Sequence, residues 1–161
     1  MEIERKFLID RFPDGLSLHF RGRVEQSYLC TSPEVRVRRV TPCAETPGEV
    51  SCKLCIKSEG SLVREEIETP ITSGQFDAIS AMTGREPITK DFRVYELGGG
   101  LRLEVSLVDE GKPTSFMYAE VEFPSVEAAE AFVPPAYLGR ELTEIPSARM
   151  KSYWENGNIG I

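Results

Sequence analysis

The sequence contains a single histidine, His19, and this scarcity excludes several kinds of active site. A serine triad and a zinc site built from several imidazoles both need more histidine than one chain position offers. Long apolar runs are missing too, and none approaches the roughly 20 residues that a membrane-spanning helix requires. The first residues include Glu2 and Glu4, where a secretory signal has a basic and then an apolar stretch. We therefore expect a cytoplasmic protein with no membrane partner.

Positive charge is also in deficit, with 19 Lys and Arg against 26 Asp and Glu, a net charge of −7. Such a surface repels phosphate backbones and argues against nucleic-acid binding, although a local basic cluster for a small anion remains compatible with it. Cysteines number only 4, and Cys52 and Cys55 form a C-x-x-C pair. On a strand these two thiols point to opposite faces and cannot chelate one ion together, so we expect ordinary thiols. The length of 161 residues predicts one domain, spanning 1–161.

Charged and apolar residues alternate with a period of two in several segments. In the first of them, Glu2, Glu4 and Lys6 share one face of a strand, while Ile3 and Phe7 share the other. Counting similar segments predicts about eight strands separated by turns. Helices are expected over 73–84, 125–133 and 147–155, and 10–20 could form a short helix.

About eight antiparallel strands favour a barrel, because closure removes exposed edges. Charges on a half-buried sheet usually form a wetted surface, but here same-face sets of mixed sign recur on most of the strands. If these faces point inward, the charges must neutralise one another or bind a charged ligand. Several cations suit a polyanion, and paired carboxylates suit a hard divalent cation. The inward set would be Lys6, Arg36, Arg38, Lys53, Arg64 and Lys90 together with Glu2, Glu4, Glu66, Glu104, Glu120 and Glu122.

The segment Glu2-Ile3-Glu4-Arg5-Lys6 resembles the ExExK signature of the CYTH family, the triphosphate tunnel metalloenzymes. The likeness extends along the chain through Val35-Arg36-Val37-Arg38, Lys53, Arg64-Glu65-Glu66-Ile67-Glu68, Lys90, Ala119-Glu120-Val121-Glu122-Phe123 and Leu138-Gly139-Arg140-Glu141-Leu142-Thr143. The resemblance implies an α+β fold: an eight-stranded antiparallel β-barrel, or tunnel, with a charged interior and a few helices packed outside. It also implies action on a small-molecule triphosphate with Mg²⁺ or Mn²⁺.

The same resemblance implies roles for individual residues. Glu2, Glu4 and Glu122 would hold the metal. Glu4, Lys6, Glu66, Glu104 and Glu120 would be catalytic, with Glu66 and Glu104 orienting the cations or the attacking water. The substrate would be bound by Lys6, Arg36, Arg38, Lys53, Arg64, Lys90 and Arg93.

Two positions depart from the family pattern. The family often has Lys-x-Arg where this chain reads Lys90-Asp91-Phe92-Arg93, one residue longer. We expect a β-bulge near Asp91 and Phe92 that returns Arg93 to the interior. Ser106 stands where relatives commonly place an acid, and this puts a second metal site in question.

Hydrolysis of inorganic tripolyphosphate to pyrophosphate and phosphate is the leading functional prediction. The alternatives are a class IV-type adenylate cyclase, a thiamine triphosphatase, and a non-catalytic binder of polyphosphate or nucleotide. A homodimer is also compatible with the sequence, since three helices would leave part of an apolar barrel exterior uncovered.

Overall fold

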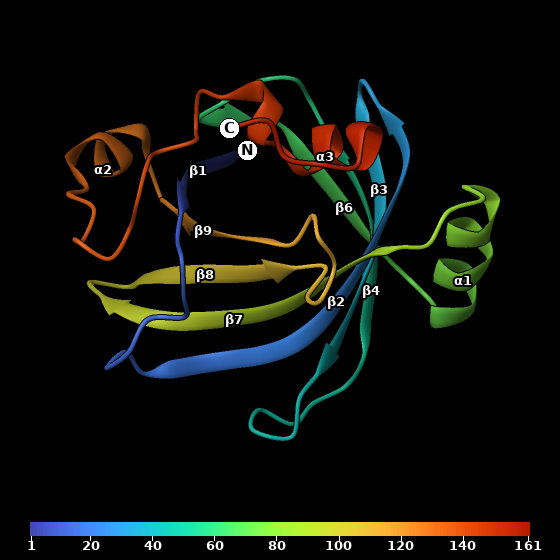
Figure 1. Ribbon diagram of the computed structural model, residues 1–161, viewed down its shortest axis with the longest axis horizontal. Coiled ribbons are helices and arrows are strands. Elements are labelled where there is room, and N and C mark those ends of the chain that lie inside the picture. The colour runs from blue at the N-terminus through green and yellow to red at the C-terminus, as the bar shows by residue number, and fades with distance from the viewer.

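The computed structural model describes residues 1–161 as one antiparallel sheet that curls into a nearly closed tunnel (Figure 1). The sheet has nine strands in the order β5-β1-β9-β8-β7-β2-β3-β4-β6. The predicted α+β fold is therefore confirmed, with one short strand more than expected. The strands are β1 (Glu2–Leu8), β2 (Leu18–Thr31), β3 (Glu34–Pro42), β4 (Ser51–Lys57), β5 (Val63–Arg64), β6 (Glu66–Ile71), β7 (Ile88–Gly98), β8 (Leu101–Val108) and β9 (Phe116–Glu122).

The two ends of the sheet are consecutive in the chain, and this closes the tunnel. Strand β5 pairs with β1 and strand β6 pairs with β4, while only Glu65 separates β5 from β6. In the register, Glu2 lies opposite Arg64 and Lys57 lies opposite Glu66. Because one short segment serves both edges, neither β1 nor β4 is left as a long open edge.

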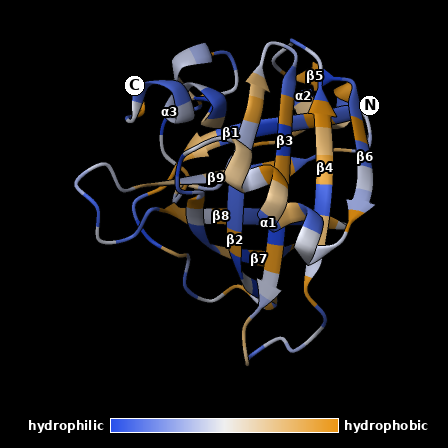
Figure 2. Ribbon diagram, turned by 90° about the vertical axis from the view of Figure 1, so that its right-hand side faces the viewer, coloured by the Kyte–Doolittle hydropathy of each residue, from blue (hydrophilic) through white to orange (hydrophobic).

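Helix α1 (Ser73–Met82) covers the outer face of β3 and β4 (Figure 1). Thr72 caps it with a capping box: the Thr72 hydroxyl accepts from the Gln75 backbone N–H, and the Gln75 side-chain oxygen accepts from the Thr72 backbone N–H. Phe76 is the buried anchor and packs with Val37 and Cys52. The helix agrees with the sequence prediction, and Figure 2 shows the alternation of β3 and β4 as bands of opposite colour.

Helix α2 (Val126–Ala131) covers a second part of the outer wall, near β1. Ser125 caps it by accepting a bond from the Ala128 amide, as predicted. Beneath it lies the main core cluster, which includes Ile3 and Phe7 from β1. The apolar side of the β1 pattern therefore faces outward into packed protein, which leaves the charged side facing the tunnel.

The C-terminal segment forms a 3-10 turn, η1 (Pro146–Ala148), and then α3 (Met150–Asn156). The single helix predicted there is thus divided. Met150, Tyr153 and Trp154 pack against Tyr28 and Tyr118, two tyrosines of the inward-facing rows. The α3 segment therefore closes part of the tunnel with apolar groups.

The short helix considered for 10–20 is absent. Residues 10–17 form bends and irregular backbone, and β2 begins at Leu18. Strand pairing decides this, because the chain from Leu18 onward is held in register with β7. None of the helices has both the length and the apolar character needed to cross a membrane.

Candidate functional site

A cavity of about 380 Å³ occupies the tunnel, and charged side chains dominate its wall. Acidic and cationic residues line it in equal numbers, so burial of the charges is offset by pairing. The cationic residues are Lys6, Arg36, Arg38, Lys53, Lys57, Arg64, Lys90 and Arg149, and the acidic residues are Glu2, Glu4, Glu34, Glu66, Glu68, Glu104, Glu120 and Glu122.

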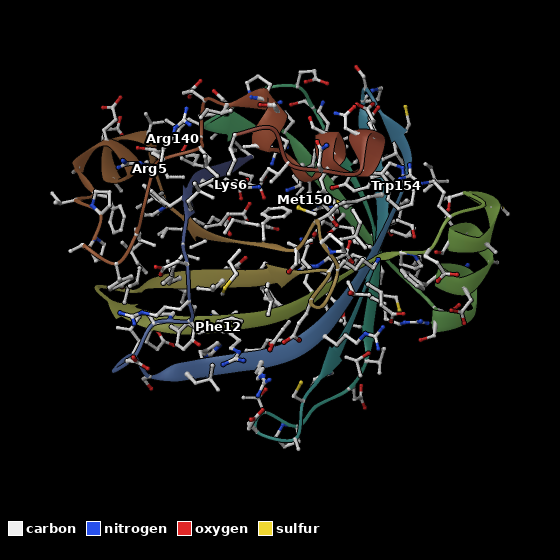
Figure 3. All side chains as sticks on the ribbon, in the orientation of Figure 1. Arg5, Lys6, Phe12, Arg140, Met150 and Trp154 are labelled. Carbon is white, nitrogen blue, oxygen red and sulfur yellow. The ribbon has the colours of Figure 1, made fainter.

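Strand register explains how distant sequence motifs meet in this cavity. On β1 and β9, Glu4 lies opposite Glu122 and Lys6 lies opposite Glu120. Because side chains alternate along a strand, fixing one pair inward fixes the others. Figure 3 shows the result at neighbouring positions: Lys6 lies toward the middle of the molecule, whereas Arg5 lies on the side of α2. Arg5 bonds there to Glu141 at 2.8 Å.

One end of the charged wall is an acidic pole, which we define as Glu2, Glu4, Glu66 and Glu122. Lys57 donates to both oxygens of Glu2, at 2.8 and 3.0 Å, and Arg64 donates to Glu4 at 3.0 Å.

Despite these partners, repulsion persists within the acidic pole. Burial and the charges of Glu120 and Glu2 raise the pKa of Glu4 to about 7. Burial, Glu2 and Glu66 likewise raise the pKa of Glu122. Bringing these carboxylates together therefore carries an electrostatic cost, which an additional cation would relieve.

A second region of the wall is a cationic pole, defined as Arg36, Arg38 and Lys90. The Nε atoms of Arg36 and Arg38 are buried and have no hydrogen-bond partner. Arg38 lies over the ring of Phe92, 5.0 Å from its centroid, and has no carboxylate within ion-pair distance. Lys90 donates to the Tyr118 hydroxyl at 2.7 Å, but burial, Arg38 and Arg36 lower its pKa well below the ordinary value. This pole has donors to spare and is suited to an anion.

Lys6 and Glu120 lie between the two poles, 3.7 Å apart. Burial alone would raise the pKa of Glu120, but Lys6 and Lys90 outweigh burial and lower it, so this carboxylate stays ionised. Glu104 lies opposite Glu120 in the register of β8 and β9. Burial and Glu120 raise the pKa of Glu104 to about 7. The pKa values of two neighbouring carboxylates are thus shifted in opposite directions.

The donor set of the acidic pole fits a hard divalent cation, because it consists of carboxylate oxygens whose mutual repulsion such an ion removes. A group of three potential ligand atoms overlaps this set at Glu66: the ligand atoms of Cys55, Glu66 and Glu68 lie within 4.8 Å of one another. Burial raises the pKa of the Cys55 thiol to about 11, and this thiol donates to Glu66 at 3.2 Å. The protonated Cys55 thiol therefore donates a hydrogen bond to Glu66 and is not available as a metal ligand. The metal ligands that remain in this region are carboxylate oxygens.

The predicted site residues lie in the tunnel wall with one exception. Lys53 lies near the cavity rim, where it bonds to Glu68 at 2.7 Å with both side chains partly exposed. The exception is Arg93, for which the predicted bulge is wrong. Pairing of β7 with β8 runs without a shift from Lys90 to Glu96, so Arg93 and Lys90 face opposite sides.

Arg93 lies on the outer face of β7. It bonds to Asp91 at 2.9 Å, and its guanidinium lies 3.5 Å from the ring centroid of Phe12. Asp91 also accepts from Arg21 at 3.0 Å. The additional residue in the motif therefore serves an outer ion-pair cluster, and Arg93 is removed from the substrate-binding set.

Several tunnel residues were missing from the sequence prediction. Lys57 shares the predicted inward face of β4 with Lys53, so strict use of the alternation would have found it. Glu34 pairs with Arg36 at 3.4 Å and with Arg64 at 3.5 Å, but it begins a strand, where alternation gives little guidance. Gln26 and Tyr28 carry no charge, and no sequence signal separated them from core residues.

Cys52 and Cys55 lie on the two faces that the strand alternation predicted, and His19 lies away from the tunnel. Cys55 contacts tunnel residues, whereas Cys52 packs outside with Phe76, so the two thiols lie on opposite faces of β4. All four cysteines are free. His19 lies 3.1 Å from Glu96 at an exposed position away from the cavity. Ser106 lines the tunnel in place of an acid and lies opposite Tyr118 in the register.

The sheet forms a nearly closed antiparallel tunnel, and an acidic pole and a cationic pole line its cavity. These features define a class of β-barrel proteins whose interior is suited to a charged ligand. The inorganic triphosphatase of Nitrosomonas europaea is 38% identical to this chain over 146 residues, which are 89% of each protein. On this basis, the chain belongs to the inorganic triphosphatases of the CYTH, or triphosphate tunnel, family. No family model matches the chain.

Solved structures have the same fold. A crystal structure of an inorganic triphosphatase is 31% identical, with a TM-score of 0.64, and the match covers all of this chain and 96% of that one. A putative adenylyl cyclase from Hippeastrum, described as having a dominant triphosphatase activity, is 16% identical with a TM-score of 0.62. That match covers 99% of this chain and 98% of the other, and at this identity it speaks for the fold alone.

Proposed function

We propose that this protein hydrolyses inorganic tripolyphosphate to pyrophosphate and phosphate, with Mg²⁺ or Mn²⁺ as the cofactor. The observation that carries the proposal is the cationic pole, where the Nε atoms of Arg36 and Arg38 are buried without partners in a charged cavity. Buried polar atoms are normally hydrogen-bonded, so unsatisfied donors of this kind indicate an anionic ligand. The 38% identity to an inorganic triphosphatase supports the same substrate.

The extent of the cationic surface favours a triphosphate over a single phosphate. Arg36 and Arg38 lie two residues apart on β3, and Lys90 approaches from β7 on the other side of β2. Lys6 extends the positive surface toward Glu120 and the acidic pole. A linear chain of phosphates can contact these groups in succession, with the guanidinium groups binding oxygens in pairs.

Hydrolysis of a phosphoanhydride passes through a loose transition state, so the protein chiefly positions groups and offsets charge. Arg36 and Arg38 supply fixed positive charge to the phosphate oxygens, and Lys90 adds N–H donors beside them. Lys6 is held between Glu120 and the ring of Tyr118, 3.9 Å from its centroid, and this position keeps its ammonium group within the tunnel. These side chains are ordered before substrate arrives, which reduces the reorganisation needed during reaction.

Glu2, Glu4 and Glu122 would hold the divalent cation, and Glu66 adjoins them. When bound, the cation would polarise phosphate oxygens and offset charge that develops in the transition state. Within the protein, Lys57 and Arg64 already neutralise part of this cluster. They keep the carboxylates in place, and they would share these oxygens with the cation.

Glu120 and Glu104 are the groups that could orient the attacking water. Lys6 and Lys90 keep Glu120 ionised, so it can accept a hydrogen bond. The pKa of Glu104, about 7, suits a group that takes up a proton near neutral pH. In this assignment Glu66 is a positioning residue, because it pairs with Lys57 at 3.4 Å.

A substrate panel tests the proposal. Purified protein is incubated with Mg²⁺ or Mn²⁺ and with tripolyphosphate, thiamine triphosphate or ATP, and the products are separated. Rapid release of phosphate from tripolyphosphate supports the proposal. Cyclic nucleotide with pyrophosphate would instead show a cyclase. Preferential hydrolysis of thiamine triphosphate would show a thiamine triphosphatase, and binding without turnover would show a non-catalytic binder.

A further inference from the structure

Gln26 occupies the middle of the cationic pole. On one side of β2, Gln26 lies opposite Arg38 of β3; on the other, the neighbouring Val24 lies opposite Lys90 of β7. The Gln26 side chain lines the tunnel and is 0% exposed. The uncharged amide thus lies beside Arg38 on one strand, with Ile88 opposite it on β7 and Lys90 two residues further along β7.

One half of the Gln26 amide has a partner and the other half has none. Nε2 lies 2.8 Å from the Tyr28 hydroxyl, while Oε1 is buried without a hydrogen bond. Buried amides are normally satisfied on both sides, so the free half indicates a group that comes from outside the protein. Because the oxygen and the NH₂ group have similar sizes, the amide can turn by 180° in the same space.

The surroundings of Tyr28 determine which half faces the cavity. Tyr28 also lies opposite Arg36 in the register of β2 and β3. A guanidinium only donates, so a hydroxyl that faces Arg36 can accept from it and give its own proton to Gln26. That proton needs an acceptor, which is Oε1. Nε2 then faces the cavity and has hydrogens to donate.

We propose that Gln26 is a substrate-binding residue that donates a hydrogen bond from Nε2 to a phosphate oxygen of the triphosphate, while its Oε1 accepts from the Tyr28 hydroxyl. This inference rests on the proposed function and deepens it. It places a neutral donor among the cations of the cationic pole, next to Arg38.

A neutral donor at this position has a physical rationale. Lys90 already experiences repulsion from Arg38 and Arg36, and another cation on β2 would increase it. A carboxylate there would pair with Arg38 and repel the phosphate chain. An amide adds a hydrogen bond to the anion and leaves the charge balance of the empty tunnel unchanged.

The decisive variant is Gln26→Glu, because it has nearly the same size but replaces the NH₂ donor with a negative acceptor. We expect the KM for tripolyphosphate to rise by about 10- to 100-fold, the range of one charge-assisted hydrogen bond. Gln26→Met removes the donor without adding charge, and we expect a rise of about 3- to 10-fold. Both are measured together with the dissociation constant for tripolyphosphate in metal-free buffer, by calorimetry, which does not depend on turnover.

Ser27→Ala provides the matched control. Ser27 is the next residue on β2, is equally buried, and bonds to Ser80 outside the tunnel at 2.7 Å. Its loss removes a buried hydrogen bond of the same strand, so we expect a lower melting temperature with unchanged KM and dissociation constant. The melting temperatures of the Gln26 variants then distinguish a loss of binding from a loss of folding. If Gln26→Glu does not fold, the affinity of Gln26→Met still tests the inference.

Gln26→Glu with wild-type or tighter affinity would overturn the inference, because the amide would then be idle or would accept a hydrogen bond from the ligand. Unchanged affinity in Gln26→Met would overturn it as well. Wild-type protein that binds no tripolyphosphate at all would contradict the proposed function together with the inference. Wild-type protein that binds it, with variants that bind equally well, would contradict the inference alone.

Discussion

Lys57 and Glu2 face each other across the seam at which the tunnel closes. The Lys57 ammonium lies 2.8 and 3.0 Å from the two oxygens of Glu2, joining β4 to β1. Lys57 also lies 3.4 Å from Glu66 on β6. One buried cation therefore links three strands at the acidic pole, where it is only 5% exposed.

Lys57→Met removes this cation and leaves two carboxylates without their main partner. Breaking a buried ion pair from one side typically costs about 3–5 kcal/mol, and we expect the free energy of unfolding to fall by that amount. Urea denaturation at pH 7 measures it. Lys53→Met is the control on the same strand, because the Lys53–Glu68 pair is partly exposed and should contribute less than about 1 kcal/mol. Equal decreases in the free energy of unfolding of the two variants would contradict the conclusion that Lys57 stabilises the junction between β1, β4 and β6.

Glu4→Gln tests the acidic pole as a metal site. The variant keeps the size of the side chain but removes a charge from the predicted ligand set. Mutating a residue that only hydrogen-bonds to a metal ligand typically lowers activity by roughly 10- to 100-fold. Because Glu4 would be a ligand itself, we expect metal-dependent turnover of tripolyphosphate to fall by more than this. Turnover is measured against Mg²⁺ concentration. Glu65→Gln is the control, since Glu65 lies on the outside with an exposed side chain. Normal turnover in Glu4→Gln would remove Glu4 from the metal site.

Arg93→Ala tests the correction made by the structure. Since Arg93 lies outside the tunnel with Asp91 and Phe12, we expect kcat and KM for tripolyphosphate to stay within about twofold of wild type. Stability should fall by about 1 kcal/mol, from a partly exposed ion pair and a cation–π contact. Phosphate release and thermal unfolding check the two expectations. A tenfold rise in KM would return Arg93 to the substrate-binding set.

Asp91 gives a pH-dependent prediction from the same outer cluster. Burial would raise its pKa, but hydrogen bonds from Arg93 and Arg21 outweigh burial and lower it below the ordinary value of 3.8. A group with a lowered folded pKa contributes stability above the unfolded pKa, and this contribution is lost as the pH falls through the folded pKa. Asp91→Asn should therefore be less stable than wild type at pH 7, with a difference that shrinks below about pH 4. Urea titrations at both pH values measure this, and a difference that grows on acidification would contradict it.

The inward orientation of the charges could be predicted because alternation has a simple geometric meaning. Once Lys6 faces the tunnel, Glu4 and Glu2 follow, while Ile3 and Phe7 must face the outer core. This reasoning depends on neighbours along one strand, which are fully visible in the sequence.

The failures arose where the outcome depends on other strands. The expected bulge at Asp91 assumed that Arg93 belongs inside, whereas Arg21 of β2 and Phe12 provide partners on the outer face. Likewise, a binding role for Gln26 is suggested only by its neighbours in the folded sheet, which are Arg38 on the adjacent strand and the Tyr28 hydroxyl. A sequence pattern does not record such cross-strand surroundings.

The most direct test of the central claim compares Arg38→Ala with Arg39→Ala. Arg38 faces the cavity without an acidic partner, whereas Arg39 faces outward and pairs with Glu25 at 2.8 Å. Products from tripolyphosphate and Mg²⁺ are followed by phosphorus-31 NMR. We predict equal amounts of phosphate and pyrophosphate from wild type and Arg39→Ala, and a loss of kcat/KM of about 100-fold in Arg38→Ala. Undiminished hydrolysis by Arg38→Ala, or no hydrolysis by wild type, would contradict a triphosphate site inside the tunnel.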